Sequence, residues 1–340
     1  MQEVIDAINS DHFGATTLTD SMMILPYKPG RLGEMNLFNE SDPKANLRTT
    51  VVTVDEKFGK LRLIVPQARG TRNNKRARVN PKARRFGIPH FPEDTTIIAD
   101  DLANIRPYGD QTMLEAVTTE LNDRQEELKQ DHEFTHEHLR VGALKGDMID
   151  GNGETIYNWY DEFQLEQVTI NVNVGGANPD SIKLAFHDVH RKIRFAAGND
   201  RFTGFYGFCG RNFMDILSTA GEVETAYQRY LDGEVLRSGQ AISLFQYANI
   251  DIEEYWGHVN NQPFFEDNAA YIFPTGTTNI FQRYNAPANF METVNTKAKP
   301  YYAKRKMADY DTGVDIHTQS NALFLNKRPG CVIKVVLQDS

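Results

Sequence analysis

Residues 132–136 read His-Glu-Phe-Thr-His, a spacing that could hold a metal ion. On a helix the two histidines would lie one turn apart on one face and bind zinc, with Glu133 as general base. Glu154, eighteen residues beyond His136, is a candidate third ligand. This pattern predicts a zinc hydrolase. However, the surrounding segment is rich in His and acids, where such a spacing arises by chance, and His132 also lies on the packing stripe of the helix. We therefore expect half-buried histidines, with no metal and no other cofactor.

A second candidate is the stretch Asp150-Gly-Asn-Gly-Glu154, which resembles the start of a calcium loop. The sixth position of that loop should be Gly but is Thr155, and the twelfth should be Glu but is Asp161. Asn-Gly supplies the positive φ angles of a tight turn, so a β-hairpin is the better interpretation. The sequence also contains no phosphate-binding loop, no dinucleotide-binding glycine motif and no nucleophile elbow. We expect that the protein is not an enzyme.

The third feature is a basic segment, residues 69–85, which contains eight cations and no acid. The cations are Arg69, Arg72, Lys75, Arg76, Arg78, Lys82, Arg84 and Arg85. Because the whole chain carries −9 and this segment +8, the remainder carries −17. A basic arm that binds nucleic acid is one interpretation, but the segment holds no aromatic residue for stacking and the acidic remainder repels phosphate. A solvated loop without a partner is another. The third is a contact with acidic groups of a neighbouring protein.

Composition sets the broad class of the protein. The 340 residues are 40% hydrophobic and 11% aromatic, which is typical of a globular protein of two domains or of one domain with excursions. The two cysteines, Cys209 and Cys331, lie in apolar surroundings, which favours buried thiols in a reducing compartment and leaves one disulfide open. We find no signal peptide and no apolar run long enough to span a bilayer.

The first hundred residues predict extended structure. Residues 1–45 are rich in turns and carry apolar anchors without a core of their own, so we expect an arm laid over something else. These anchors are Met22, Met23, Ile24, Leu25, Leu32, Leu37 and Phe38. Two β-branched runs around the turn Glu56–Gly59 then predict a hairpin. The basic segment follows, so we expect it at the tip of a long two-stranded excursion.

Residues 111–144 predict one long helix, with Asp110 as the N-cap and Gly142 and Gly146 at its exit. Its packing stripe is expected to be Leu114, Val117, Leu121, Leu128, His132 and Leu139. After it we expect a hairpin at Gly151–Gly153 and a strand at 168–174. We further expect an amphipathic helix at 181–196, a compact α/β region at 200–290, and three C-terminal strands.

This order of elements resembles the major capsid proteins of tailed bacteriophages, specifically the lambda-type major capsid protein E family. The resemblance covers nearly the whole chain. It rests on the order of the elements and on stretches of similar sequence, and not on a set of catalytic residues. Three stretches carry it: TTVVTVDEKFGKLRLIVPQARG, ALKGDMIDGNGETIYNWYDEF and YYAKRKMADYDTGVDIHTQSNALFLNKRPGCVIKVV.

The resemblance implies an α+β fold, the tailed-phage major capsid fold. Residues 1–46 would be the N-terminal arm and 47–92 the extended loop, a β-hairpin excursion that overlies a neighbouring subunit. Residues 93–180 and 301–340 would form the peripheral domain with its spine helix at 111–144, and 181–300 the axial domain.

The implied function is self-assembly into the icosahedral shell that encloses the double-stranded DNA genome of a tailed phage. The implied partners are copies of the chain in hexamers and pentamers, a separate scaffolding protein because the arm begins almost at Met1, and the portal; a decoration protein is left open. Packaged DNA would be touched only non-specifically, and no membrane is involved. The subunit would assemble in the cytoplasm of the host bacterium and end in the virion. We expect the eight cations of residues 69–85 to make intersubunit contacts.

Overall fold

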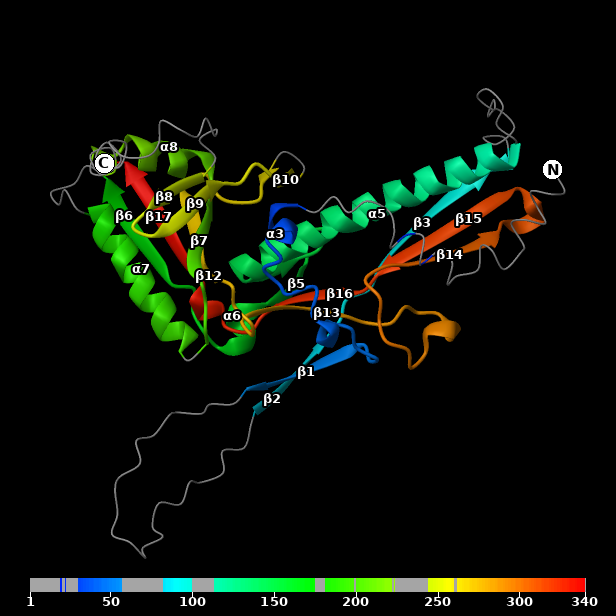
Figure 1. Cartoon of the computed structure of the whole chain (residues 1–340), viewed down its shortest axis with the longest axis horizontal. Helices are drawn as coiled ribbons and strands as arrows, with labels where there is room; N and C mark the ends of the chain where they lie inside the picture. The colour runs from blue at the N-terminus through cyan, green and yellow to red at the C-terminus, as the bar shows by residue number, and fades with distance from the viewer. Residues whose placement is uncertain are drawn as a thin grey trace, which may run out of the picture.

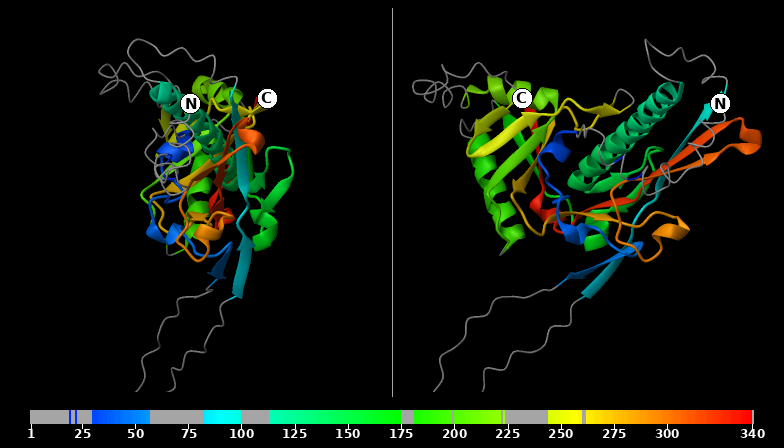
Figure 2. Two further views of the ribbon diagram at one scale, coloured as in Figure 1. Left: turned by 90° about the vertical axis from the view of Figure 1, so that its right-hand side faces the viewer. Right: turned by 45° about the vertical axis from the view of Figure 1, so that its right-hand side comes forward.

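The structure is a computed structural model that describes residues 30–56, 82–99, 113–174, 181–198, 200–221, 244–259 and 262–339, together with residues 19, 22 and 223. These residues form an α/β unit, a long limb built on one helix and a three-stranded sheet, and a two-stranded projection (Figures 1 and 2). None of the helices within the described ranges is long and apolar enough to cross a membrane.

The α/β unit is organised around a six-stranded mixed sheet. Its strands, in spatial order, are β6 (Thr169–Val174), β17 (Ile333–Asp339), β12 (Ala269–Thr275), β7 (Gly204–Cys209), β9 (Ile250–Glu254) and β8 (Leu244–Tyr247). Helices α7 (Ser181–Ala197) and α8 (Arg211–Thr219) cover it. The predicted stripe of the first helix is confirmed, because Ile182, Phe186, Val189 and Ile193 are all buried. Cys209 and Cys331 are buried free thiols.

The last strand of the chain, β17, lies within the sheet of the α/β unit. Residues 301–340 are predicted to belong to the peripheral domain, and β17 lies inside the six-stranded sheet, parallel to β6 and antiparallel to β12. Its side chains Ile333, Val335 and Leu337 are fully buried there. A strand buried on both sides by neighbours supplies more apolar contact than an edge position would, which explains why the chain returns to this sheet.

The limb consists of helix α5 (Met113–Lys145) packed on the antiparallel sheet β14–β15–β3. These strands span Tyr302–Met307, Gly313–Ser320 and Phe91–Ile98. The 33 residues of the helix correspond to a length of about 50 Å. Leu121 and Leu128 meet Ile97, Val314 and Ile316 of the sheet. The long helix predicted at 111–144 is therefore confirmed; Asp110 lies outside the described residues.

The exit of α5 differs in detail from the prediction. Gly142 lies inside the helix, and only Gly146, with a φ of +101°, ends it. A hairpin follows, formed by β4 (Asp147–Ile149) and β5 (Thr155–Asn158), and then the short helix α6 (Trp159–Phe163). The Asp150 carboxylate accepts hydrogen bonds from the backbone N–H groups of Asn152 and Glu154, both at 2.8 Å. The Gly-Asn-Gly stretch is therefore the predicted turn.

The projection is formed by β1 (Val51–Glu56) and β2 (Lys82–Gly87), which pair antiparallel from Val51 opposite Gly87 to Glu56 opposite Lys82. The predicted hairpin around Glu56–Gly59 would instead pair β1 with the residues directly after the turn. Residues 57–81, which include most of that hairpin, lie outside the described residues.

The remaining elements are short. They are α3 (Arg31–Glu34), β10 (His258–Val259), β11 (Gln262–Pro263), β13 (Phe281–Asn285), β16 (Ala322–Asn326), and 3₁₀ turns at Pro43–Ala45, Met291–Thr293, Asp309–Asp311 and Pro329–Cys331. Strand β13 pairs with β16 between the limb and the α/β unit (Figure 1).

Candidate functional site

The two histidines of the H-E-x-x-H motif lie on the buried face of α5. His132 Nε2 is 3.0 Å from Thr318 Oγ1, and His136 Nε2 is 2.8 Å from Ser320 Oγ. Each hydroxyl donates its single hydrogen to a backbone carbonyl, Thr318 to Glu93 and Ser320 to Pro300. Each Nε2 must therefore carry a proton and donate it, so these two nitrogens have no lone pair to offer a metal.

Burial keeps both imidazoles neutral. It lowers the pKa of His132 to about 4, and the pKa of His136 falls well below its ordinary value through burial and the nearby Arg283 and Arg140 guanidinium groups. Glu133 is buried beside Lys129, with 3.9 Å between Oε1 and Nζ, and Glu154 lies in the exposed β4–β5 turn. Within the described ranges, no three His, Cys, Asp or Glu side chains are arranged to hold a metal. The motif is part of the helix–sheet packing.

Glu137 and Arg140, within one turn near the end of α5, instead contribute to a buried ionic junction that the sequence did not reveal. Glu40 accepts hydrogen bonds from Arg140 Nε at 2.7 Å and from Arg283 Nη1 at 2.6 Å, and both guanidinium groups are buried. Burial alone would raise the pKa of Glu40, but the two guanidinium groups outweigh it and lower that pKa below its ordinary value. Arg140 also donates to Glu137 Oε2 at 3.0 Å.

Glu137 joins the short helix α3 to α5. Its carboxylate accepts hydrogen bonds from the N–H groups of Leu32 at 2.7 Å and Gly33 at 3.2 Å, which are orphan donors of the first helical turn. The Tyr255 hydroxyl donates to the same carboxylate at 2.7 Å. A Cβ at Gly30 would overlap the Glu137 side chain, so glycine is required at this close approach.

Arg31 fastens α3 to the α/β unit. Its Nε lies 2.9 Å from both carboxylate oxygens of Glu253 on β9, and Nη2 donates to the Tyr206 hydroxyl at 3.3 Å. Because α3 is bonded to α5 on one side and to β9 on the other, it bridges the limb and the α/β unit.

The apolar anchors predicted for the N-terminal arm belong to the same junction. Leu32, Leu37 and Phe38 are buried, and the Phe38 ring makes edge contacts with Phe281 and Phe324 at centroid distances of 5.5 and 5.3 Å. Residues 30–46 are therefore laid over the body of their own subunit. Met22 is also buried, in a cluster with Tyr301 and Ala303, whereas Met23, Ile24 and Leu25 lie outside the described residues.

The basic segment is only partly within the described residues. Lys82, Arg84 and Arg85 belong to strand β2, at the base of the projection, rather than to a loop tip. The Arg84 guanidinium donates to the Glu162 carbonyl of its own subunit and lies 5.2 Å from the centroid of the Phe163 ring. Arg85 is exposed. Arg69, Arg72, Lys75, Arg76 and Arg78 lie outside the described residues.

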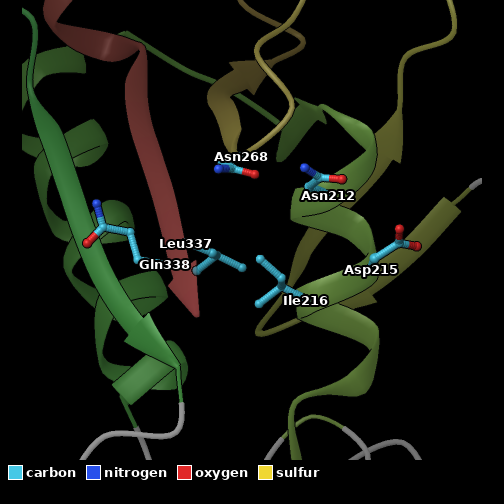
Figure 3. Close-up of a pocket in the computed structure, with 6 residues that line it drawn as sticks. All are labelled: Asn212, Asp215, Ile216, Asn268, Leu337 and Gln338. Carbon is cyan, nitrogen blue, oxygen red and sulfur yellow. The ribbon is translucent and has the colours of Figure 1, made fainter. Parts of the chain in front are cut away.

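A pocket of about 520 Å³ lies between α8 and the end of β17 (Figure 3). Its lining side chains are Asn212, Asp215, Ile216, Asn268, Leu337 and Gln338. Amides, one carboxylate and two aliphatic groups provide no nucleophile with an adjacent base, so this pocket does not form an active site.

Comparison with known proteins identifies the fold. The crystal structure of a protein described as the capsid protein of a prophage of E. coli CFT073 superposes with a TM-score of 0.54 at 12% identity, covering 96% of this chain and 99% of that one. The fold is thus the α+β major capsid fold of tailed phages, as the sequence predicted.

Sequence similarity extends over almost the whole chain. Residues 14–337 match the model of the family described as phage major capsid protein E. The major capsid protein of Pseudomonas phage KPP10 is 25% identical over 345 residues, 95% of this chain and 97% of that protein. The major capsid protein of Salmonella phage Felix O1 is 23% identical, over 74% of this chain and 77% of that protein. The chain belongs to the phage major capsid protein E family, which is a structural family and not an enzyme family.

Proposed function

We propose that this protein is the major head subunit that assembles with its own copies, as hexamers and pentamers, into the icosahedral shell around the double-stranded DNA genome of a tailed phage. The observation that carries the proposal is the family match over residues 14–337. The subunit would assemble in the cytoplasm of the host bacterium, on a separate scaffolding protein and a portal, and remain in the virion. Its negative remainder would keep packaged DNA from adhering to the inner surface.

The extended loop is proposed to make contacts between subunits. β1 and β2 leave the body as a two-stranded projection. Lys82, Arg84 and Arg85 lie on β2, and the other five cations belong to the sequence that joins β1 to β2. Arginine forms bidentate contacts with carboxylates, and the acids of a neighbouring subunit are abundant. Each exposed pair contributes only about 0–1 kcal/mol, but the contacts recur in every subunit of a closed shell.

The test compares assembly with DNA binding in one variant. Arg72→Glu/Arg76→Glu/Arg78→Glu, which leaves Arg84 and its own-subunit contacts intact, should abolish shells when expressed with the scaffolding protein, while circular dichroism stays unchanged. The matched control Arg72→Lys/Arg76→Lys/Arg78→Lys keeps the charge and should still assemble. If the cations instead gripped DNA, the unassembled protein would bind duplex with a slope of log K against log salt of about −0.9 per phosphate contact. Normal shells together with lost DNA binding in the Glu variant would contradict the proposal.

A further inference from the structure

The turn between β4 and β5 holds two dipeptides of the same kind. Asp150-Gly151 is followed directly by Asn152-Gly153, which is the only Asn-Gly pair in the chain. In such a pair the backbone nitrogen of the glycine can attack the side-chain carbonyl carbon of the residue before it and close a five-membered succinimide ring. Glycine favours this reaction because it has no side chain to obstruct the approach. The two pairs adjoin in one turn, so the fold decides which of them reacts.

Asp150 is held away from this reaction. Its Oδ1 accepts hydrogen bonds from the backbone N–H groups of Asn152 and Glu154, both at 2.8 Å. The side chain is therefore turned towards nitrogens two and four residues ahead, and both charge-assisted bonds must break before its carbon can meet the nitrogen of Gly151. A carboxylate carbon is also a poorer target for a nucleophile than an amide carbon. The first pair is protected twice.

Asn152 has neither protection. It is exposed, as are Gly151 and Gly153 on either side, and its side-chain amide makes no hydrogen bond to any residue that the structure describes. A Cβ placed on Gly153 would meet no atom within 4 Å, so the space around the attacking residue is open. The Gly153 N–H donates to the Asp150 carbonyl at 3.2 Å, the long end of the normal range. The attacking nitrogen is thus only weakly held.

We propose that Asn152 is a site of spontaneous modification, at which the native turn leaves the side-chain amide free to cyclise with Gly153 while Asp150 stays intact. The Gly153 nitrogen bonds to Cγ of Asn152, the bond from Cγ to the amide nitrogen breaks, and ammonia leaves with the proton lost from Gly153. Water then opens the succinimide. Cleavage of the bond between the ring nitrogen and Cγ gives aspartate, and cleavage of the bond between that nitrogen and the backbone carbonyl carbon gives isoaspartate.

Both products change the hairpin. Each replaces a neutral amide by a carboxylate in an exposed turn that already contains Asp150 and Glu154, so like charges are crowded there. Isoaspartate also lengthens the main chain by one methylene. The turn is closed by a hydrogen bond of 2.9 Å from the Asp150 N–H to the Glu154 carbonyl, and an atom inserted between these residues must displace it. Ageing therefore weakens the β4–β5 hairpin, on which Met148 is fully buried.

The variant Asp150→Asn tests the inference by placing the same dipeptide at both positions. The new amide oxygen at position 150 can still accept the two N–H bonds, so only the geometry distinguishes the two sites. Unassembled full-length subunits would be incubated near pH 8 and mapped by mass spectrometry, since deamidation raises the mass of a peptide by about 1 Da. We expect position 152 to react about tenfold faster than position 150, because two hydrogen bonds restrain the latter. In urea the turn is unfolded, and the two positions should react at similar rates.

The wild-type chain and a matched control complete the test. Folded wild-type subunits should accumulate isoaspartate at position 152, detected by enzymatic methylation of isoaspartyl groups, and none at position 150. Asn152→Gln keeps an amide but would need a six-membered ring, so it should remain unmethylated after the same incubation. Equal rates at the two positions of folded Asp150→Asn would overturn the inference. So would an Asn152 that stays unmodified in folded wild-type subunits while the urea-unfolded chain reacts.

Discussion

His132 and His136 illustrate how a motif that could do chemistry becomes part of a core. Their Nε2 atoms are committed as donors to Thr318 and Ser320, 186 and 184 residues away in the sequence. Sequence reasoning placed His132 on the packing stripe and expected half-buried histidines, but it could not identify the hydroxyl partners. Partners so far apart along the chain leave no local signal.

The histidines predict a pH dependence of stability. The ordinary pKa of histidine is about 6.5, and that of folded His132 is about 4. Between these values the unfolded chain binds a proton that the folded chain does not, so stability is lost as the pH falls from about 6.5 towards 4. For His132 alone the loss amounts to about 2 kcal/mol between pH 7 and pH 5.

Urea unfolding of unassembled subunits at pH 7 and pH 5 measures this loss. His132→Gln, which can still donate to Thr318, should lose about 2 kcal/mol less than the wild type over the same interval. Other titrating groups are common to both proteins and cancel in the comparison. An identical pH dependence of the two proteins would show that His132 is not held neutral by burial.

The loss of Arg140 should destabilise the subunit strongly. It is fully buried and bonded to both Glu40 and Glu137, so Arg140→Met removes a buried cation from both carboxylates, although Glu40 keeps Arg283. We expect a loss of about 3–5 kcal/mol in the free energy of unfolding. Arg124→Met, on the exposed face of the same helix, should leave that free energy nearly unchanged, and equal effects of the two substitutions would count against a buried junction.

At the scale of elements, local patterns predicted most helices and strands. Helix α5 and the stripe of α7 follow from 3.6-residue periodicity, and the β4–β5 turn follows from Gly-Asn-Gly. The helical periodicity could also have predicted that Arg140 is buried, because Arg140 follows the buried His132 and His136 at four-residue spacing. Its partner Glu40, and Arg283, which shares that carboxylate, could not have been found, since they lie 100 and 143 residues away from Arg140 in the sequence.

The end of α5 gives a prediction about one turn. Gly146 has a φ of +101°, and a Cβ there would overlap the ring of Tyr160. Gly146→Ala should therefore destabilise the subunit by at least about 1–3 kcal/mol through backbone strain alone. Gly151→Ala in the neighbouring turn meets no atom within 4 Å and has no such φ, so it should be close to neutral. Thermal unfolding of both variants makes the comparison, and a neutral Gly146→Ala would contradict this geometry.

At the scale of the whole molecule, the resemblance to a family predicted the fold, whereas the assembly of its parts required coordinates. The sequence did not indicate that β17 lies within the sheet of the α/β unit, or that residues 30–46 pack against the body of their own subunit. Both depend on contacts between segments far apart in the sequence, β17 with β6 and β12, and residues 30–46 with α5 and β13, about which hydrophobic periodicity carries no information. The domain boundaries and the intersubunit role of the eight cations remain predictions.

The central claim is that this chain builds a closed shell from copies of itself. Electron cryo-microscopy of the protein, purified after expression with its scaffolding protein, tests this claim most directly. We predict closed icosahedral particles in which hexamers and pentamers of this chain form the shell. A population that contains only dispersed, folded monomers, at every salt and protein concentration tried, would contradict the account.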